Sequence, residues 1–238
     1  MTTTTKKPLP KTKRPLFTLT LPSTGEKVHY HSFSGREEKT LLMAKESEDP
    51  AQNILAVKQV VNNCLVDKSI SDISMFDLEY IMLVLRSKSI DNMVSVIVKD
   101  PDTEEDVNLE FDLDTVKVNI PEGHTNKVKI DDTYTLFMRY PSIDEFLTLI
   151  TEGDTPETGY KIMNNCLDKL VSENEVFEFS EFSDKEIEEF ILDLDAETLK
   201  AIRNFFETVP RLRHEMKYVT KDGKDKTFVI EGIQSFFT

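Results

Sequence analysis

Two histidines are the first candidates for metal chemistry. His29 and His31 are two residues apart in a segment with strand-like alternation, so both rings would lie on the same face. A zinc site needs three or four ligands. The other histidines, His124 and His214, lie far along the chain without patterned carboxylates beside them. We therefore predict no metal site at these positions.

Residues 100–106 resemble the beginning of a calcium-binding loop, with acids at Asp100, Asp102 and Asp106. An EF-hand loop requires glycine at its sixth position and glutamate at its twelfth. Those two positions hold Glu105 and Phe111. The pattern therefore fails, and we interpret the segment as an acidic hairpin turn.

Paired carboxylates occur at Asp112 with Asp114 and at Asp193 with Asp195. Glycosidases and nucleases use such pairs, but an acidic chain contains them by chance. We interpret these four residues as surface charges. A carboxylate-dependent hydrolase remains the least favoured alternative for the function.

The sequence contains no pattern typical of a catalytic centre. Its seven glycines are not clustered into a phosphate-binding loop, and no serine lies in a nucleophile elbow. Cys64 and Cys166 have no histidine nearby in sequence, and two cysteines are too few for a disulfide framework. We predict buried thiols in a reducing cytoplasm, no catalytic or cofactor-binding residues, no cofactor and no enzyme activity.

The charge of the chain limits its partners. Net charge is −15, yet the first fourteen residues hold five basic residues and no acidic one, so the remainder is more acidic still. Such a surface repels nucleic-acid phosphates, and we expect no nucleic-acid partner. Apolar runs stay well below the roughly 18 residues that a membrane helix needs, which predicts no membrane span.

The hydropathy pattern predicts an α+β fold. We expect antiparallel β-hairpins near both termini and a central small β-subdomain, separated by helical segments. The expected divisions are a disordered basic tail (1–14), an N-terminal hairpin with helices (15–90), the β-subdomain (91–140), and C-terminal helices with a hairpin (141–238). We expect residues 15–238 to form one compact unit, in which the two terminal hairpins join one sheet.

Several helices are predicted from their first residues. A capping box satisfies free amides at a helix start through a residue at the N-cap and another three positions later. Four pairs fit: Ser34 with Glu37, Asp49 with Gln52, Ser142 with Glu145, and Ser183 with Glu186. A further helix is expected over residues 75–86, where residues 80–85 are apolar all round. Such a helix is buried centrally or presents one face to a partner.

One short motif occurs twice. Asn-Asn-Cys-Leu appears at residues 62–65 and again at 164–167, each time closing an apolar helix and leading, we expect, towards another helix. A duplicated helix pair would explain it. We favour chance recurrence, because no fixed period is sustained.

The best candidates for partner binding lie in the apolar helix and at the C-terminus. Arg211 and Arg213 alternate with apolar residues on a predicted strand, and Phe236 and Phe237 follow near the end of the chain. Two phenylalanines near a terminus must be buried in the core or offered to a partner. We predict the following partner-binding residues: Tyr80, Leu83, Arg211, Arg213, Phe236 and Phe237.

Several segments in order resemble one protein family. They include LTLPSTG (19–25), REEK (36–39), AKES (44–47), VVNNC (60–64), FDLEY (76–80), LRSKS (85–89), FFETVPRLRH (205–214) and GIQSFF (232–237). Together they resemble the baseplate hub protein family of T4-like bacteriophages, which includes a hub subunit and a hub assembly catalyst. None of these segments is a catalytic motif.

The resemblance implies a phage tail baseplate hub assembly protein that acts by protein–protein binding, with chaperone-like character and late expression. Its implied partners are other baseplate hub proteins. Its implied location is the host cytoplasm during assembly, with the virion tail as a further possibility. A stable structural subunit of the hub in the virion is the alternative function.

Overall fold

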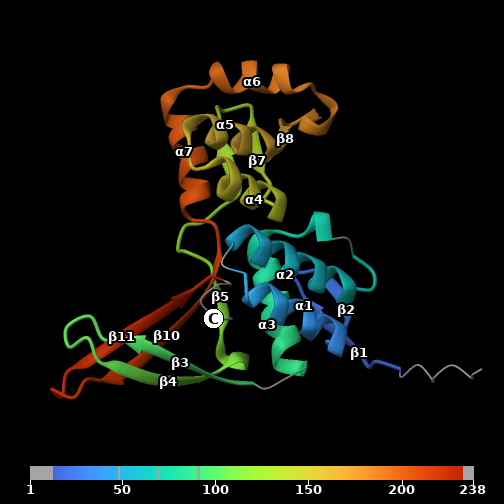
Figure 1. Ribbon diagram of the computed structural model, residues 1–238. Coiled ribbons are helices and arrows are strands. Elements are labelled where there is room, and N and C mark those ends of the chain that lie inside the picture. The colour runs from blue at the N-terminus through green and yellow to red at the C-terminus, as the bar shows by residue number, and fades with distance from the viewer. Residues whose placement is uncertain (1–12, 48, 69, 90–91, 233–238) are drawn as a thin grey trace, which may run out of the picture.

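The computed structural model describes residues 13–47, 49–68, 70–89 and 92–232. The predicted tail is therefore mostly outside the described residues, as are Phe236 and Phe237. Within the described part, Arg14 already contacts the fold, since its guanidinium lies 3.7 Å from a carboxylate oxygen of Glu37. The α+β class is confirmed, with helices and small antiparallel sheets (Figure 1).

The elements occur in the following order. The N-terminal part contains β1 (Leu16–Thr20), β2 (Lys27–His31), α1 (Gly35–Lys45), α2 (Pro50–Cys64), η1 (Ile70–Asp72) and α3 (Met75–Ser89). The middle contains β3 (Met93–Lys99), β4 (Asp106–Asp112), η2 (Leu113–Thr115), β5 (Lys117–Asn119), β6 (Lys127–Lys129) and β7 (Thr135–Met138). The last part contains α4 (Ile143–Glu152), α5 (Pro156–Asn165), β8 (Leu167–Val171), β9 (Val176–Glu178), η3 (Phe179–Glu181), α6 (Asp184–Leu192), α7 (Ala196–Glu207), β10 (Arg211–Val219) and β11 (Asp225–Glu231).

The strands form four separate sheets within the described residues, ordered β1-β2, β11-β10-β5, β3-β4 and β6-β7-β8-β9. The two terminal hairpins do not join one sheet, so that expectation is wrong: β10 pairs with β5 instead, with Leu212 opposite Val118. The strands of residues 91–140 are distributed over three of these sheets. Figure 1 shows the β3-β4 and β10-β11 hairpins extending together away from the helices.

Three hydrophobic clusters make up the core of the described residues. The first lies between the β1-β2 hairpin and helices α1–α4, the second joins the four-stranded sheet to α5, α6 and α7, and the third joins β3, β4, β5, β10 and β11. Helix α3 connects two of them, because Leu78, Ile81 and Met82 belong to the first cluster and Leu83 to the third. The prediction of a helix buried on nearly all sides is confirmed.

Helix starts follow the predicted caps. Ser34, Ser142 and Ser183 each form a complete capping box with the glutamate three residues later. At α2 the predicted box of Asp49 with Gln52 is not formed: Asp49 accepts a hydrogen bond from the Ala51 amide instead, with Pro50 in the first turn. Caps of this kind are typically worth about 1 kcal/mol each.

The recurring Asn-Asn-Cys-Leu motif marks a structural repeat. The first repeat (residues 16–89) and the second repeat (residues 127–192) both contain a hairpin, a helix with a Ser-Glu capping box, a helix with proline in its first turn, the motif, a 3-10 turn and another helix. Pairing is also equivalent, since Leu65 bridges Tyr30 and Leu167 pairs with Met138, each opposite the second hairpin strand. This shared order favours a duplicated unit over chance recurrence, although the second repeat has two further strands, β8 and β9, between its motif and its 3-10 turn.

The motif itself has the same environment in both repeats. Cys64 and Cys166 are both fully buried, and burial raises the pKa of the Cys64 thiol to about 11 and that of Cys166 to about 12. The prediction of buried thiols is confirmed. The second motif leads into strand β8, not into a helix as expected, because Leu167 continues the sheet beside β7.

A buried ionic cluster fastens the two long hairpins to each other. Asp100, in the β3-β4 turn, is 1% exposed and accepts hydrogen bonds from the Tyr218 hydroxyl at 2.7 Å and from Lys226 Nζ at 2.7 and 2.9 Å. The amides of Asp102 and Thr103 also donate to it. The bonds from Lys226 hold the pKa of Asp100 well below its ordinary value, although burial opposes them. Asp100, predicted from sequence to begin an acidic turn, therefore holds the β3-β4 hairpin against the β10-β11 hairpin.

We expect Asp100→Asn to lower the melting temperature at pH 7 and to lose this effect in acid. The pKa of Asp100 is depressed in the folded state, so its stabilising contribution is present above the unfolded-state value of about 4 and is lost as pH falls through the folded-state value. The raised pKa of Lys226 matters only in strong alkali. Thermal unfolding of wild type and variant between pH 2 and 8 measures the difference. Asp102→Asn, at an exposed partner of Lys226, is the control with a smaller expected effect; a difference that stays constant with pH would contradict the assignment.

Candidate interaction surfaces

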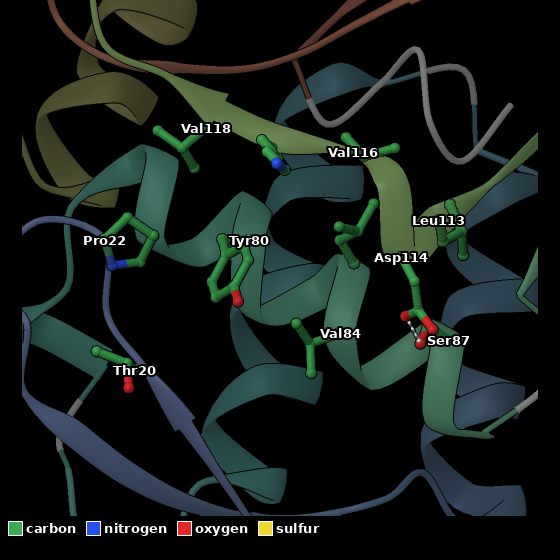
Figure 2. A pocket seen from close by; sticks show the side chains of 11 residues that line it. Thr20, Pro22, Tyr80, Val84, Ser87, Leu113, Asp114, Val116 and Val118 are labelled. Atoms are coloured by element: carbon green, nitrogen blue, oxygen red, sulfur yellow. Dashed lines mark hydrogen bonds between the residues drawn. The ribbon is translucent and has the colours of Figure 1, made fainter.

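A cavity lies beside α3, near two of the predicted anchors, Tyr80 and Leu83. It has a volume of about 380 Å³ and lies between the β1-β2 hairpin, α3 and the segment from η2 to β5. We call it the α3 cavity. Figure 2 shows Tyr80 and Val84 on the helix, with Thr20 and Pro22 on one side and Val116 and Val118 on the other.

The α3 cavity has an apolar floor and a polar mouth. Leu83 is 3% exposed and contributes to the floor, whereas Tyr80 and Val84 are half-buried. At one end, the Ser87 hydroxyl donates to Asp114 at 2.8 Å, as the dashed line in Figure 2 shows. The exposed Lys117 lies at another part of the lining. A site of this size and character fits an apolar side chain presented by another molecule.

Two buried carboxylates fix the wall of this site from within α3. Asp77 accepts hydrogen bonds from the Ser74 hydroxyl at 2.7 Å and from the Ser23 amide at 3.0 Å, which ties the β1-β2 turn to the helix. Glu79 accepts from the Leu212 amide at 3.3 Å and so ties β10 to the opposite side. These polar contacts hold the hairpin and the sheet at fixed positions around the cavity.

Arg211 and Arg213 lie close to the α3 cavity but are already engaged in ion pairs. In the β5-β10 ladder, Arg213 is opposite Lys117 of the cavity lining. Arg211 Nη1 lies 3.0 Å from Glu231 Oε1, and Arg213 Nη2 lies 2.8 Å from Glu215 Oε1. The predicted alternation along β10 is confirmed, since Leu212 is fully buried between the two arginines. The alternation along the strand already places Glu215 on the same face as Arg213, whereas the proximity of Glu231 depends on the pairing of β10 with β11.

The structure brings four of the six predicted binding residues into one region. Tyr80 and Leu83 line the α3 cavity, and Arg211 and Arg213 lie on the strand beside β5. Phe236 and Phe237 lie outside the described residues. The cavity walls supplied by Pro22 and Val118 were not predicted as part of a site, because their proximity to α3 depends on contacts between distant segments.

The candidate metal and carboxylate residues have structural partners. His29 Nδ1 pairs with Asp67, and His31 Nδ1 lies 2.9 Å from the Pro15 carbonyl oxygen. Asp195 caps α7 by accepting from the Thr198 amide. Among the residues that the structure describes, no group of three or more His, Cys, Asp or Glu side chains is placed to hold a metal ion.

The paired acids of the middle segment serve in turns. Asp112 accepts from the Asp114 amide at 2.9 Å and caps η2. Asp114 itself accepts from Asn92 at 3.0 Å as well as from Ser87. These contacts explain the pair as a local turn structure at the edge of the α3 cavity.

Removing both arginine charges should change stability little. We expect the double variant Arg211→Gln with Arg213→Gln to lower the free energy of unfolding by no more than about 1 kcal/mol, because exposed ion pairs contribute little. Leu212→Ala, between them, is the matched control and should cost roughly 2–5 kcal/mol, since its side chain is fully buried. Urea unfolding monitored by circular dichroism gives both values. A loss above about 2 kcal/mol in the double variant would show that the arginines are structural.

Comparison with known proteins gives the family of the chain. No curated protein and no solved structure matches it. No helix in the described segments is long and apolar enough to cross a membrane. The family described as T4 bacteriophage base plate protein matches residues 14–238, nearly the whole chain and every element around the α3 cavity. The chain therefore belongs to the T4 bacteriophage base plate protein family.

Proposed function

We propose that this protein builds the baseplate hub of a contractile phage tail by binding other hub proteins, without catalysing a reaction. The observation that carries the proposal is the family match over residues 14–238. We further propose that it acts during assembly in the host cytoplasm, as an assembly protein with chaperone-like character.

The α3 cavity is the proposed contact for a hub partner. Its apolar floor at Leu83 and its half-buried Tyr80 and Val84 can receive one large apolar side chain. Buried apolar anchors in central pockets supply much of the binding energy in protein interfaces. Arg211 and Arg213 lie nearby and would orient a partner through their charges, which affects association rate more than affinity.

The buried carboxylates suit the cavity to binding because they keep it preformed. Asp77 and Glu79 hold the two walls through hydrogen bonds to backbone amides of Ser23 and Leu212. A preformed site loses less conformational entropy when a partner binds. The fully buried thiols, whose raised pKa values keep them protonated at neutral pH, are poorly suited to nucleophilic chemistry.

We expect Val84→Asp to reduce co-purification of hub proteins from infected cells roughly tenfold or more, because a charge in the apolar cavity opposes insertion of an apolar anchor. The measurement is quantitative mass spectrometry after affinity capture of the tagged full-length chain. Lys117→Glu, at an exposed lining position, is a second variant that leaves the helix unaltered. Val176→Asp, at an exposed position of β9, is the matched control and should capture normal amounts.

Normal capture by both cavity variants would refute the α3 cavity as the contact, and failure of the wild-type chain to capture any hub protein would refute the hub role. Mass spectrometry of purified virions tests the timing. An assembly protein should be absent or far below stoichiometric amounts, whereas a stoichiometric amount would identify a stable structural subunit of the hub.

A further inference from the structure

The two repeats of this chain pack against each other through one specific helix. Helix α4, which belongs to the second repeat, places Phe146, Leu147 and Ile150 against the hydrophobic cluster of the first repeat. Its beginning is fixed beside α3 by the Met75 amide, which donates to the Pro141 carbonyl oxygen at 3.3 Å. Helix α4 of the second repeat therefore covers the groove between α2 and α3 of the first repeat.

The equivalent groove of the second repeat is open. It has a volume of about 880 Å³ and lies between α5, β8 and α6; we call it the α6 groove. Phe182 and Leu192 line it and are 39% and 68% exposed. When the repeats are matched at their N-cap serines Ser74 and Ser183, these two positions correspond to Ile73 and Leu83, which are 1% and 3% exposed.

Further correspondences support this match. Cluster residues Ile70 and Phe179 begin the two 3-10 turns and are 9% and 8% exposed. Met82 and Ile191 are each 1% exposed. The positions therefore agree where both repeats bury them in their own cores. They differ at Ile73, which lies in the cluster that α4 covers, and at Leu83, which is covered by the strands of the third cluster.

Helix α1 is the counterpart of α4, and it packs on α2 of its own repeat. Matching the capping boxes at Ser34 and Ser142 aligns Leu42 with Ile150, which packs on the neighbouring repeat. The same match aligns the other two docking residues of α4, Phe146 and Leu147, with Glu38 and Lys39 of α1. Leu42 is 60% exposed and Met43 is 63% exposed. Lys39 is also exposed, and its spacing from these two residues places all three on one helix face. Helix α1 therefore exposes an apolar pair, Leu42 and Met43, at one end of the face that corresponds to the docking face of α4.

The charges on the two surfaces are complementary. The α6 groove is lined by more acidic than basic side chains, and the acids are Glu157, Asp168, Glu178, Asp184 and Glu188. Its basic lining residues Arg139 and Lys161 already pair with Glu145 and Glu152. Helix α1 exposes Arg36, Lys39 and Lys45 and one acid, Glu38, and its C-cap Glu46 is also exposed. The acidic groove therefore favours this helix through a small excess of basic side chains beside Leu42 and Met43.

We propose that the α6 groove binds helix α1 of a second copy of this chain. The contact is head-to-tail, because the two surfaces differ, and repetition of such a contact generates a ring if the rotation closes and an open filament if it does not. Figure 1 shows α6 at one end of the molecule and α1 in the opposite half, so both surfaces can be engaged at once. This self-association uses neither the α3 cavity nor the proposed hub partner.

Sedimentation velocity of the purified full-length chain over a range of concentrations tests the proposal. Wild type should self-associate. Leu42→Glu and Leu192→Glu should each weaken association at least tenfold, because each puts a charge into the apolar contact. Both side chains are mostly exposed, so folding should be retained and circular dichroism should be unchanged. Ile97→Glu, at a 73% exposed position of β3, is the matched control and should associate like wild type.

Mixing the two variants distinguishes the head-to-tail arrangement. The Leu42→Glu chain keeps an intact groove and the Leu192→Glu chain keeps an intact helix, so an equimolar mixture should form heterodimers that grow no further. A wild-type chain that stays monomeric at all concentrations, or a mixture that does not pair, would overturn the proposal. Either result would leave the capture of hub proteins through the α3 cavity unaffected, so the two proposals fail separately.

Discussion

The fold depends on the need to cover α3 on nearly every side. Its sequence contains an unbroken apolar run over residues 80–85, and burial of one large apolar side chain is worth about 1.5–3 kcal/mol. No single sheet or helix layer can cover the whole circumference of a helix. The chain solves this by placing the first repeat against one side of α3 and the β5-β10 sheet against another. The α3 cavity is the place where these two coverings meet.

The buried acids in α3 make this arrangement specific as well as stable. Asp77 is 1% exposed and Glu79 is 7% exposed, and a buried carboxylate without partners would be strongly unfavourable. Each acid is satisfied by a backbone amide from a different distant segment, Ser23 for Asp77 and Leu212 for Glu79. An apolar helix alone would tolerate small shifts of its neighbours. The hydrogen bonds do not, because a displaced amide leaves a buried charge unsatisfied.

Local features of the fold could be predicted from sequence, and its long-range pairing could not. Capping serines, the apolar circumference of α3 and the alternation along β10 are each encoded within a few residues, and all are confirmed. The pairing of β10 with β5 joins segments about ninety residues apart, where several short strands have similar alternation. The α3 cavity shares this limitation, since Val118 is placed by that pairing and Pro22 by the contact of the β1-β2 turn with Asp77.

Comparison of equivalent positions in α3 and α6 identifies an apolar surface that is exposed in the second repeat. Along α6, positions equivalent to the buried or half-buried Phe76, Tyr80 and Val84 of α3 hold Lys185, Glu189 and Asp193. Charged residues at these positions suit a helix that faces water where α3 faces protein.

Leu192 is different, because it corresponds to Leu83 and is apolar although it is 68% exposed. A single exposed leucine needs no explanation by itself. This leucine lies in a groove together with exposed Tyr160 and Phe182, whereas its counterpart Leu83 is covered by the strands of the third cluster. The second repeat has charged residues at three positions where the first has apolar or aromatic ones, yet Leu192 and Phe182 are apolar and exposed. A contact with another molecule explains why these two side chains are apolar.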